Sequence, residues 1–281
     1  MFDTLKRVVR RLAPPIVVEI YRRLRGSGIQ FHGVYSSWGA AQRHTEGYDA
    51  DTVLQRVREA QSAVMKGEAV SERDGVLFHQ AQYPFPVIAI LLRAATENQN
   101  RLTILDFGGA FGSTYYQCRD FLMQLKSLRW CIVEQPGFVA CGRQQFQNEI
   151  IHFYSSVPEC LAQEQPQVVL LSGVLQYLAD PDQTLDELSQ SGAKYIVIDR
   201  TPVAINGEQV VTIQTVPKTI IRSSYPVWLF NEPTLKRPLL ERYEEIATFD
   251  TVDPELGSGR LKARFNGFIF RKRDGQSKGP R

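Results

Sequence analysis

The sequence has few cysteines, no long apolar run and almost no excess of charge, and each of these shortages excludes a class of protein. Its four cysteines form no C-x-x-C pair, and no histidine stands at metal-finger spacing from them. We therefore expect free thiols in a reducing compartment and no metal site. A net charge of +3 is too small to indicate nucleic acid as a partner. No stretch is long and apolar enough to cross a bilayer, and no signal-peptide cleavage site follows the basic start, so the cytoplasm is the expected location.

The basic residues are concentrated at the two ends of the chain. They are Lys6, Arg7, Arg10, Arg11, Arg22, Arg23 and Arg25 at the start, and Arg271, Lys272, Arg273, Lys278 and Arg281 at the end. Weak attraction of the first segment to an anionic membrane face is possible in principle, but Pro14 and Pro15 interrupt it and favour a solvated segment. We expect three regions: a basic segment with a helical lid over residues 1–98, a cofactor-binding domain over 99–273, and a disordered basic tail over 274–281.

Apolar spacing predicts the elements of the domain. Residues 27–49 read as a loop, and residues 50–67 and 85–98 as helices. Short apolar strands follow at 102–106, 130–134, 150–154, 168–172 and 195–199, with helices near 113–127, 137–148 and 182–191 between them. Strands that alternate with helices in this way predict an α/β fold with a mostly parallel sheet. Segments 243–250 and 265–273 are expected to pair as antiparallel strands at one edge.

A glycine-rich turn follows the first of these strands. Asp106, Gly108, Ala110 and Gly112 fit the pattern D-x-G-x-G-x-G with its middle glycine replaced, whereas the dinucleotide pattern G-x-G-x-x-G does not fit. Such a turn lets the backbone approach a ligand closely, although a purely structural tight turn has the same spacing. Glu134 ends the next strand, where a carboxylate can bind a ribose diol or, alternatively, cap the following helix.

These segments together resemble class I S-adenosylmethionine-dependent methyltransferases over residues 104–202. The phrases ILDFGGAFGSTYYQ, WCIVEQPGFVACG, VLLSGVLQYL, YIVIDRTP and SSYPVWLF resemble more closely a bacterial methyltransferase family often found near surface-polysaccharide genes. The resemblance implies a Rossmann-like class I sheet with an antiparallel edge strand and N-terminal helices. It implies S-adenosylmethionine as the cofactor, bound by Asp106, Gly108, Gly109, Ala110, Gly112, Glu134, Gln135, Ser155, Ser172 and Gly173. Ser155 and Ser156 depart from the family pattern, which has an acidic residue after the third strand.

The acceptor site is expected beyond the carboxyl end of the fifth strand. The connection over residues 201–232 is long enough to be a lid, and we expect His79, Asp199, Arg200 and Tyr225 to border one pocket there. For each of them a structural role is the alternative: an ion pair of Asp199 with Arg200, a structural histidine, or packing by Tyr225. The expected function is methyl transfer to oxygen of a small-molecule or saccharide acceptor. The alternatives are a non-catalytic cofactor-binding or scaffold protein and an NAD-dependent oxidoreductase.

Overall fold

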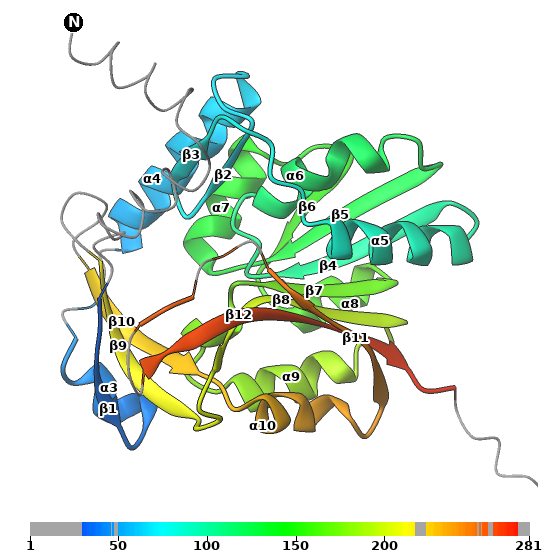
Figure 1. Ribbon diagram of the computed structural model, residues 1–281. Coiled ribbons are helices and arrows are strands. Elements are labelled where there is room, and N and C mark those ends of the chain that lie inside the picture. The colour runs from blue at the N-terminus through cyan, green and yellow to red at the C-terminus, as the bar shows by residue number, and fades with distance from the viewer. Residues whose placement is uncertain are drawn as a thin grey trace, which may run out of the picture.

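A central seven-stranded sheet organises the protein (Figure 1). The computed structural model describes residues 30–45, 47, 50–216, 223–251, 253, 255–257 and 261–274. The strand order is β11-β12-β8-β7-β4-β5-β6. The strands span β4 (Arg101–Phe107), β5 (Ser127–Val133), β6 (Ile151–Tyr154), β7 (Val168–Ser172), β8 (Tyr195–Ala204), β11 (Tyr243–Asp250) and β12 (Ala263–Lys272).

Strand pairing confirms the expected fold class. β4 lies parallel to both β5 and β7, β5 to β6, and β7 to β8. β12 pairs antiparallel with β8, and β11 pairs antiparallel with β12 at the edge of the sheet. The two late strands therefore form the expected antiparallel pair, in which β12 alone runs against the parallel strands. The inner strands are apolar on both sides because both faces are covered; Val168, Val169, Leu170 and Leu171 are all fully buried.

Helices cover the two faces of the sheet and create two apolar cores (Figure 1). Helices α4 (Ala50–Met65), α5 (Phe85–Glu97), α6 (Ser113–Leu122) and α7 (Pro136–Gln145) contribute to one core. Helices α8 (Val157–Gln163), α9 (Pro181–Ser189) and α10 (Glu232–Lys236) contribute to the other. Neighbouring strand residues alternate between the cores, as Ile104 and Leu105 do, because strand side chains have a period of two.

Two short elements escape the sequence analysis although both carry a local signal. Ser156 is the N-cap of helix α8, and its hydroxyl accepts from the amide of Glu159. The two residues have the S-x-x-E spacing of a capping box. Strands β2 (Ser71–Arg73) and β3 (Val76–Phe78) form a hairpin closed by Asp74 and Gly75, both with positive φ. An Asp-Gly pair in that conformation is the preferred two-residue hairpin turn.

A second, antiparallel sheet corrects two expectations. It consists of β1 (Gln30–Tyr35), β9 (Val210–Val216) and β10 (Ser223–Leu229), in the order β1-β9-β10. The loop expected over 27–49 is therefore wrong for β1 and for helix α3 (Trp38–Gln42), and the long connection over 201–232 is largely strand. β1 finds its partner far along the chain, so local spacing gives no sign of the pairing.

Within these described ranges, no helix has the length and apolarity needed to cross a membrane. The basic segment of residues 1–26 and residues 275–281 of the tail lie outside the described residues, and so do residues 217–222 of the long connection.

Candidate cofactor and acceptor site

The sheet places the candidate site at its topological switch point. From β4 the chain runs to β5 and β6 on one side, and β7 and β8 lie on the other. Ligands of open α/β sheets bind outside the carboxyl ends of the strands at such a point. The glycine turn after β4 and the Ser172–Gly173 turn after β7 therefore meet at the position where a ligand is expected.

The glycine turn has the backbone that its sequence pattern requires. Gly108 and Gly112 have φ of 72° and 94°, and Ala110 has φ of 50°. The alanine that replaces the middle glycine therefore keeps a left-handed conformation, at a cost of about 1–2 kcal/mol. A Cβ on Gly108 would lie 2.4 Å from Cγ2 of Val174, so this glycine also lets the turns after β4 and β7 pack closely.

Asp106 is buried against the glycine turn. It is 1% exposed, and Trp130 donates its indole N–H to Oδ2 over 2.7 Å. A Cβ on Gly109 would lie 2.4 Å from the same oxygen, so the turn rests directly on this carboxyl. Burial raises the pKa of Asp106 to about 7, although the Trp130 hydrogen bond lowers it. The residue expected in the cofactor set thus supports the turn from below.

Glu134 joins the turn to the end of β5. Its Oε1 accepts from the amide of Ala110 over 3.1 Å, and its Oε2 accepts from the amide of Gln135 over 2.8 Å. Burial raises the pKa of Glu134, and these two amides act in the opposite direction. Each oxygen can accept a further hydrogen bond, so the carboxylate is held in place with acceptor capacity for a diol.

Ser155 stands after β6, where the family pattern has an acidic residue, and a carboxylate reaches it from the next helix. The amide of Ser155 donates to Oε2 of Glu159 over 2.7 Å, and Arg143 pairs with the other oxygen of Glu159 over 2.8 Å. Glu159 was not predicted, because the family pattern places the acid at the strand end and this one lies four residues later, in α8. The capping-box spacing from Ser156 could have found it.

The end of β7 brings Ser172, Gly173 and Asp199 together. The Ser172 hydroxyl donates to Oδ2 of Asp199 over 2.8 Å, and the amide of Gly173 donates to the Asp199 carbonyl over 2.9 Å. Asp199 is 3% exposed, and burial raises its pKa, with the Ser172 hydrogen bond opposing that shift. The hydrogen-bond partner of Asp199 is therefore Ser172, not the neighbouring Arg200.

Arg200 instead pairs with Asp253 and has a strained backbone. Its Nε donates to Oδ2 of Asp253 over 3.1 Å, and Arg73 donates to Oδ1 of the same carboxylate over 3.0 Å. The φ of Arg200 is 54°, which is uncommon for a residue with a side chain and is concentrated at functional sites. Its Nη1 lies 3.3 Å from where a Cβ on Gly173 would stand, so the guanidinium covers the turn after β7.

Tyr225 lies near this group, and His79 does not join it. The Tyr225 hydroxyl accepts from the side-chain Nε2 of Gln214 over 3.0 Å. The centroid of its ring lies 5.5 Å from that of Tyr177, in the turn after β7. His79 is exposed just beyond β3, and among the residues that the structure describes no hydrogen bond or ring contact links it to the other three. The structure thus places Asp199 and Arg200 within β8 and Tyr225 within β10, and His79 apart from them.

The hairpin supplies residues that the sequence analysis missed. Glu72 is 1% exposed, accepts a hydrogen bond from the hydroxyl of Ser113 at the start of α6, and accepts the amide of Gly75 over 3.2 Å. Burial raises the pKa of Glu72 to about 7. The Asp-Gly turn was the available signal for the hairpin, but nothing local reveals its contact with α6.

Comparisons with known proteins find similar folds only. No protein-family model matches the chain, and no curated protein matches it. The N-terminal domain of EvdMO1, solved with SAH bound, is 14% identical with a TM-score of 0.48, covering 81% of this chain and 98% of that one. A methyltransferase acting on 1,6-didemethyltoxoflavin from Burkholderia thailandensis is 15% identical with a TM-score of 0.43, covering 87% and 100%.

A SAM-dependent methyltransferase from Methanosarcina mazei is 14% identical with a TM-score of 0.48, covering 68% of this chain and 99% of that one. Such values describe a general likeness of fold. The fold class itself follows from the strand order and pairing above: a Rossmann-like, mostly parallel sheet of the class I methyltransferase type with an antiparallel edge.

Proposed function

We propose that this protein is an S-adenosylmethionine-dependent methyltransferase that acts at oxygen of a small-molecule or saccharide acceptor. The observation that carries the proposal is the hydrogen bond from the Ala110 amide to Glu134. It fixes a left-handed glycine turn and a carboxylate with spare acceptor capacity at adjacent strand ends, at the switch point of the sheet. The resemblance to a family found near polysaccharide genes supports the saccharide as acceptor.

Different residues of the site fit different parts of S-adenosylmethionine. The turn over residues 108–112 would hold its methionine end, Glu134 would accept its ribose hydroxyls, and Gln135 would lie beside them. Ser155, together with Glu159, would serve the adenine amine in place of the missing acid, because a carboxylate accepts an amine N–H. Ser172 and Gly173 would border the reacting end. When bound, the cofactor supplies an electrophilic methyl group.

The acceptor side offers a base and a cation. Asp199 would accept the proton of an acceptor hydroxyl, and Ser172 orients its carboxylate for this role. Arg200 would orient a polar acceptor with the donors that Asp253 leaves unused, because its planar fork carries five of them. Tyr225 would line the same pocket. His79, exposed and apart from them, would take part only if the segment after β3 moved.

Two other functions remain as competitors. A non-catalytic protein on this fold could bind the cofactor, or nothing, and serve as a scaffold. An NAD-dependent oxidoreductase is disfavoured because the spacing of Gly108, Ala110 and Gly112 does not give G-x-G-x-x-G. We propose the cytoplasm as the location and no nucleic acid as a partner.

Isothermal titration calorimetry with S-adenosylmethionine, its demethylated product and NAD tests the proposal. The first two should bind and NAD should not. An NAD-only response would establish the oxidoreductase. If none of the three ligands binds, the scaffold function is the one that remains. Transfer of a labelled methyl group to a panel of hydroxylated small molecules and saccharides then separates an enzyme from a cofactor-binding protein.

A further inference from the structure

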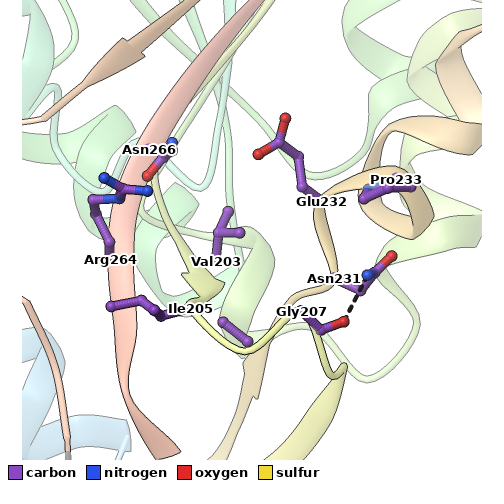
Figure 2. A pocket seen from close by; sticks show the side chains of 9 residues that line it. Val203, Ile205, Gly207, Asn231, Glu232, Pro233, Arg264 and Asn266 are labelled. Carbon is purple, nitrogen blue, oxygen red and sulfur yellow. Dashed lines mark hydrogen bonds between the residues drawn. The ribbon is translucent and has the colours of Figure 1, made fainter.

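A small polar cavity lies beyond the candidate site, where β8 leaves the sheet (Figure 2). Its volume is about 230 Å³. Val203 and Ile205 line its floor, Arg264 and Asn266 of β12 line one wall, and Glu232 at the start of α10 lines another. Val203 is three residues beyond Arg200, about 10 Å along an extended strand, so the cavity lies further along β8 than the candidate acceptor residues.

Asn266 carries a buried side-chain oxygen that has no hydrogen-bond partner among the described residues. The residue is 7% exposed, and its Oδ1 is fully buried with no partner. It stands opposite Thr201 of β8, next to an irregularity in the strand register. Native proteins pair nearly all buried side-chain polar groups, because an unpaired one loses its hydration without compensation. The side chain also lines the cavity, so a ligand there can hydrogen-bond to the Asn266 amide group.

The charged side chains of the two walls have opposite signs. Arg264 lies two residues before Asn266 on the same side of β12, is exposed, and has no carboxylate within ion-pair distance among the described residues. On the facing wall, Oε1 of Glu232 accepts from Nζ of Lys236 over 2.5 Å. That leaves Oε2 of Glu232 able to accept from a ligand.

These features define the ligand by its chemistry. A volume of about 230 Å³ holds roughly eight water molecules, which suits one small ring and not a dinucleotide. Arg264 favours an anionic group, but a phosphate dianion would be repelled by Glu232. A singly charged carboxylate with hydroxyl groups satisfies both walls, since the hydroxyls can donate to Glu232 and bond to Asn266. The apolar floor of Val203 and Ile205 can carry the face of a ring.

We propose that this cavity binds a hydroxylated ring carboxylate of the sugar-acid class. The carboxylate lies on Arg264, hydroxyls bond to Asn266 and Glu232, and the ring covers Val203 and Ile205. The site is independent of methyl transfer.

Ligand-observed NMR and calorimetry with D-glucuronate, D-glucose and glucose 1-phosphate test the proposal on the full chain. Glucuronate should bind at least about tenfold more tightly than glucose, the ratio expected for one hydrogen bond to a charged group. Arg264→Ala should remove this preference. Asn266→Leu should weaken glucuronate binding while leaving a protein at least as stable, because it deletes the unpaired oxygen. Arg271→Ala, on the same strand but paired with Glu244, is the matched control and should change nothing.

Equal binding of glucose and glucuronate, tighter binding of glucose 1-phosphate, or unchanged affinity in Arg264→Ala would each overturn the assignment. So would no glucuronate binding at all. Binding of the demethylated cofactor, measured on the same variants, distinguishes an effect on the cavity from an effect on the cofactor site. Arg264→Ala should retain it, whereas Glu134→Ala should weaken it roughly 5- to 150-fold and keep glucuronate binding.

Discussion

Glu72 of the β2–β3 hairpin accepts a hydrogen bond from the hydroxyl of Ser113, the first residue of the helix that follows the glycine turn. Its neighbour Arg73 pairs with Asp253, which in turn pairs with Arg200 in the middle of β8. Successive strand side chains leave opposite sides of the backbone. A strand of three residues thereby connects the cofactor half of the candidate site to its acceptor half.

The Glu72–Ser113 contact should be measurable as a coupling free energy. Ser113→Ala leaves a buried carboxyl with one hydrogen bond fewer, so we expect it to destabilise the protein by about 1–3 kcal/mol. In a double-mutant cycle with Glu72→Gln, followed by urea unfolding, the two effects should not add. Strict additivity would mean that the contact contributes nothing to stability.

Glu134→Ala should weaken binding of the demethylated cofactor by about 1–3 kcal/mol, because ribose hydroxyls would lose their acceptor. Calorimetry on the folded variant gives the value. Glu244→Ala, which removes only an ion pair with Arg271 at the sheet edge, is the control and should bind normally. Normal affinity in the folded Glu134→Ala protein would remove Glu134 from the site.

Asp199→Asn should separate catalysis from binding. Asparagine can still accept the hydrogen bond from Ser172, but it cannot take a proton from an acceptor. Turnover with a hydroxyl acceptor should therefore fall by about 10²–10⁴-fold, the usual contribution of a general base, while cofactor affinity stays constant. Unchanged turnover would assign Asp199 a purely structural role with Ser172.

Asp106→Asn should change how stability depends on pH. Burial raises the pKa of Asp106 from 3.8 to about 7, so between these values the folded protein keeps a proton that the unfolded chain has released. The free energy of unfolding contributed by this group therefore falls as pH rises through that window. Relative to the wild type, the variant should gain roughly 3 kcal/mol between pH 4 and pH 7. A constant difference across urea titrations would show that Asp106 is ionised throughout.

Glu97 should give the free energy of unfolding the opposite pH dependence. The hydrogen bond from Lys194, with those from Tyr195 and Arg93, lowers the pKa of Glu97 to about 2 against the effect of burial. Its contribution to stability is complete above the ordinary carboxyl pKa of 4.5 and is lost as pH falls towards 2. Glu97→Gln should cost about 1 kcal/mol at pH 7 and almost nothing near pH 2. Equal losses at both pH values, measured by thermal unfolding, would contradict this.

The parallel strands and the antiparallel edge pair could be predicted because each is a short apolar run set off by local signals. The glycine turn and Glu134 could be placed together because they end adjacent strands of one βαβ unit, where sequence distance and spatial distance agree. The left-handed φ of Ala110 is consistent with the glycine pattern that it interrupts.

Other features escaped prediction because their partners are far apart in sequence. β1 pairs with β9, and Arg200 pairs with Asp253 instead of its neighbour Asp199. No spacing rule links such residues, since their contacts exist only when the sheet has assembled.

The amino-acid sequence by itself determined the α/β class, the order of the parallel strands' segments and the residues of the glycine turn, because apolar period and turn chemistry act over a few residues. Only the tertiary structure decided that the β2–β3 hairpin contacts α6 and that Asp106 lies beneath the turn. It also decided that Arg264, Asn266 and Glu232 line one cavity. Those relationships depend on how three separate elements pack, and burial and charge at such a junction are set by neighbours that the local sequence does not contain.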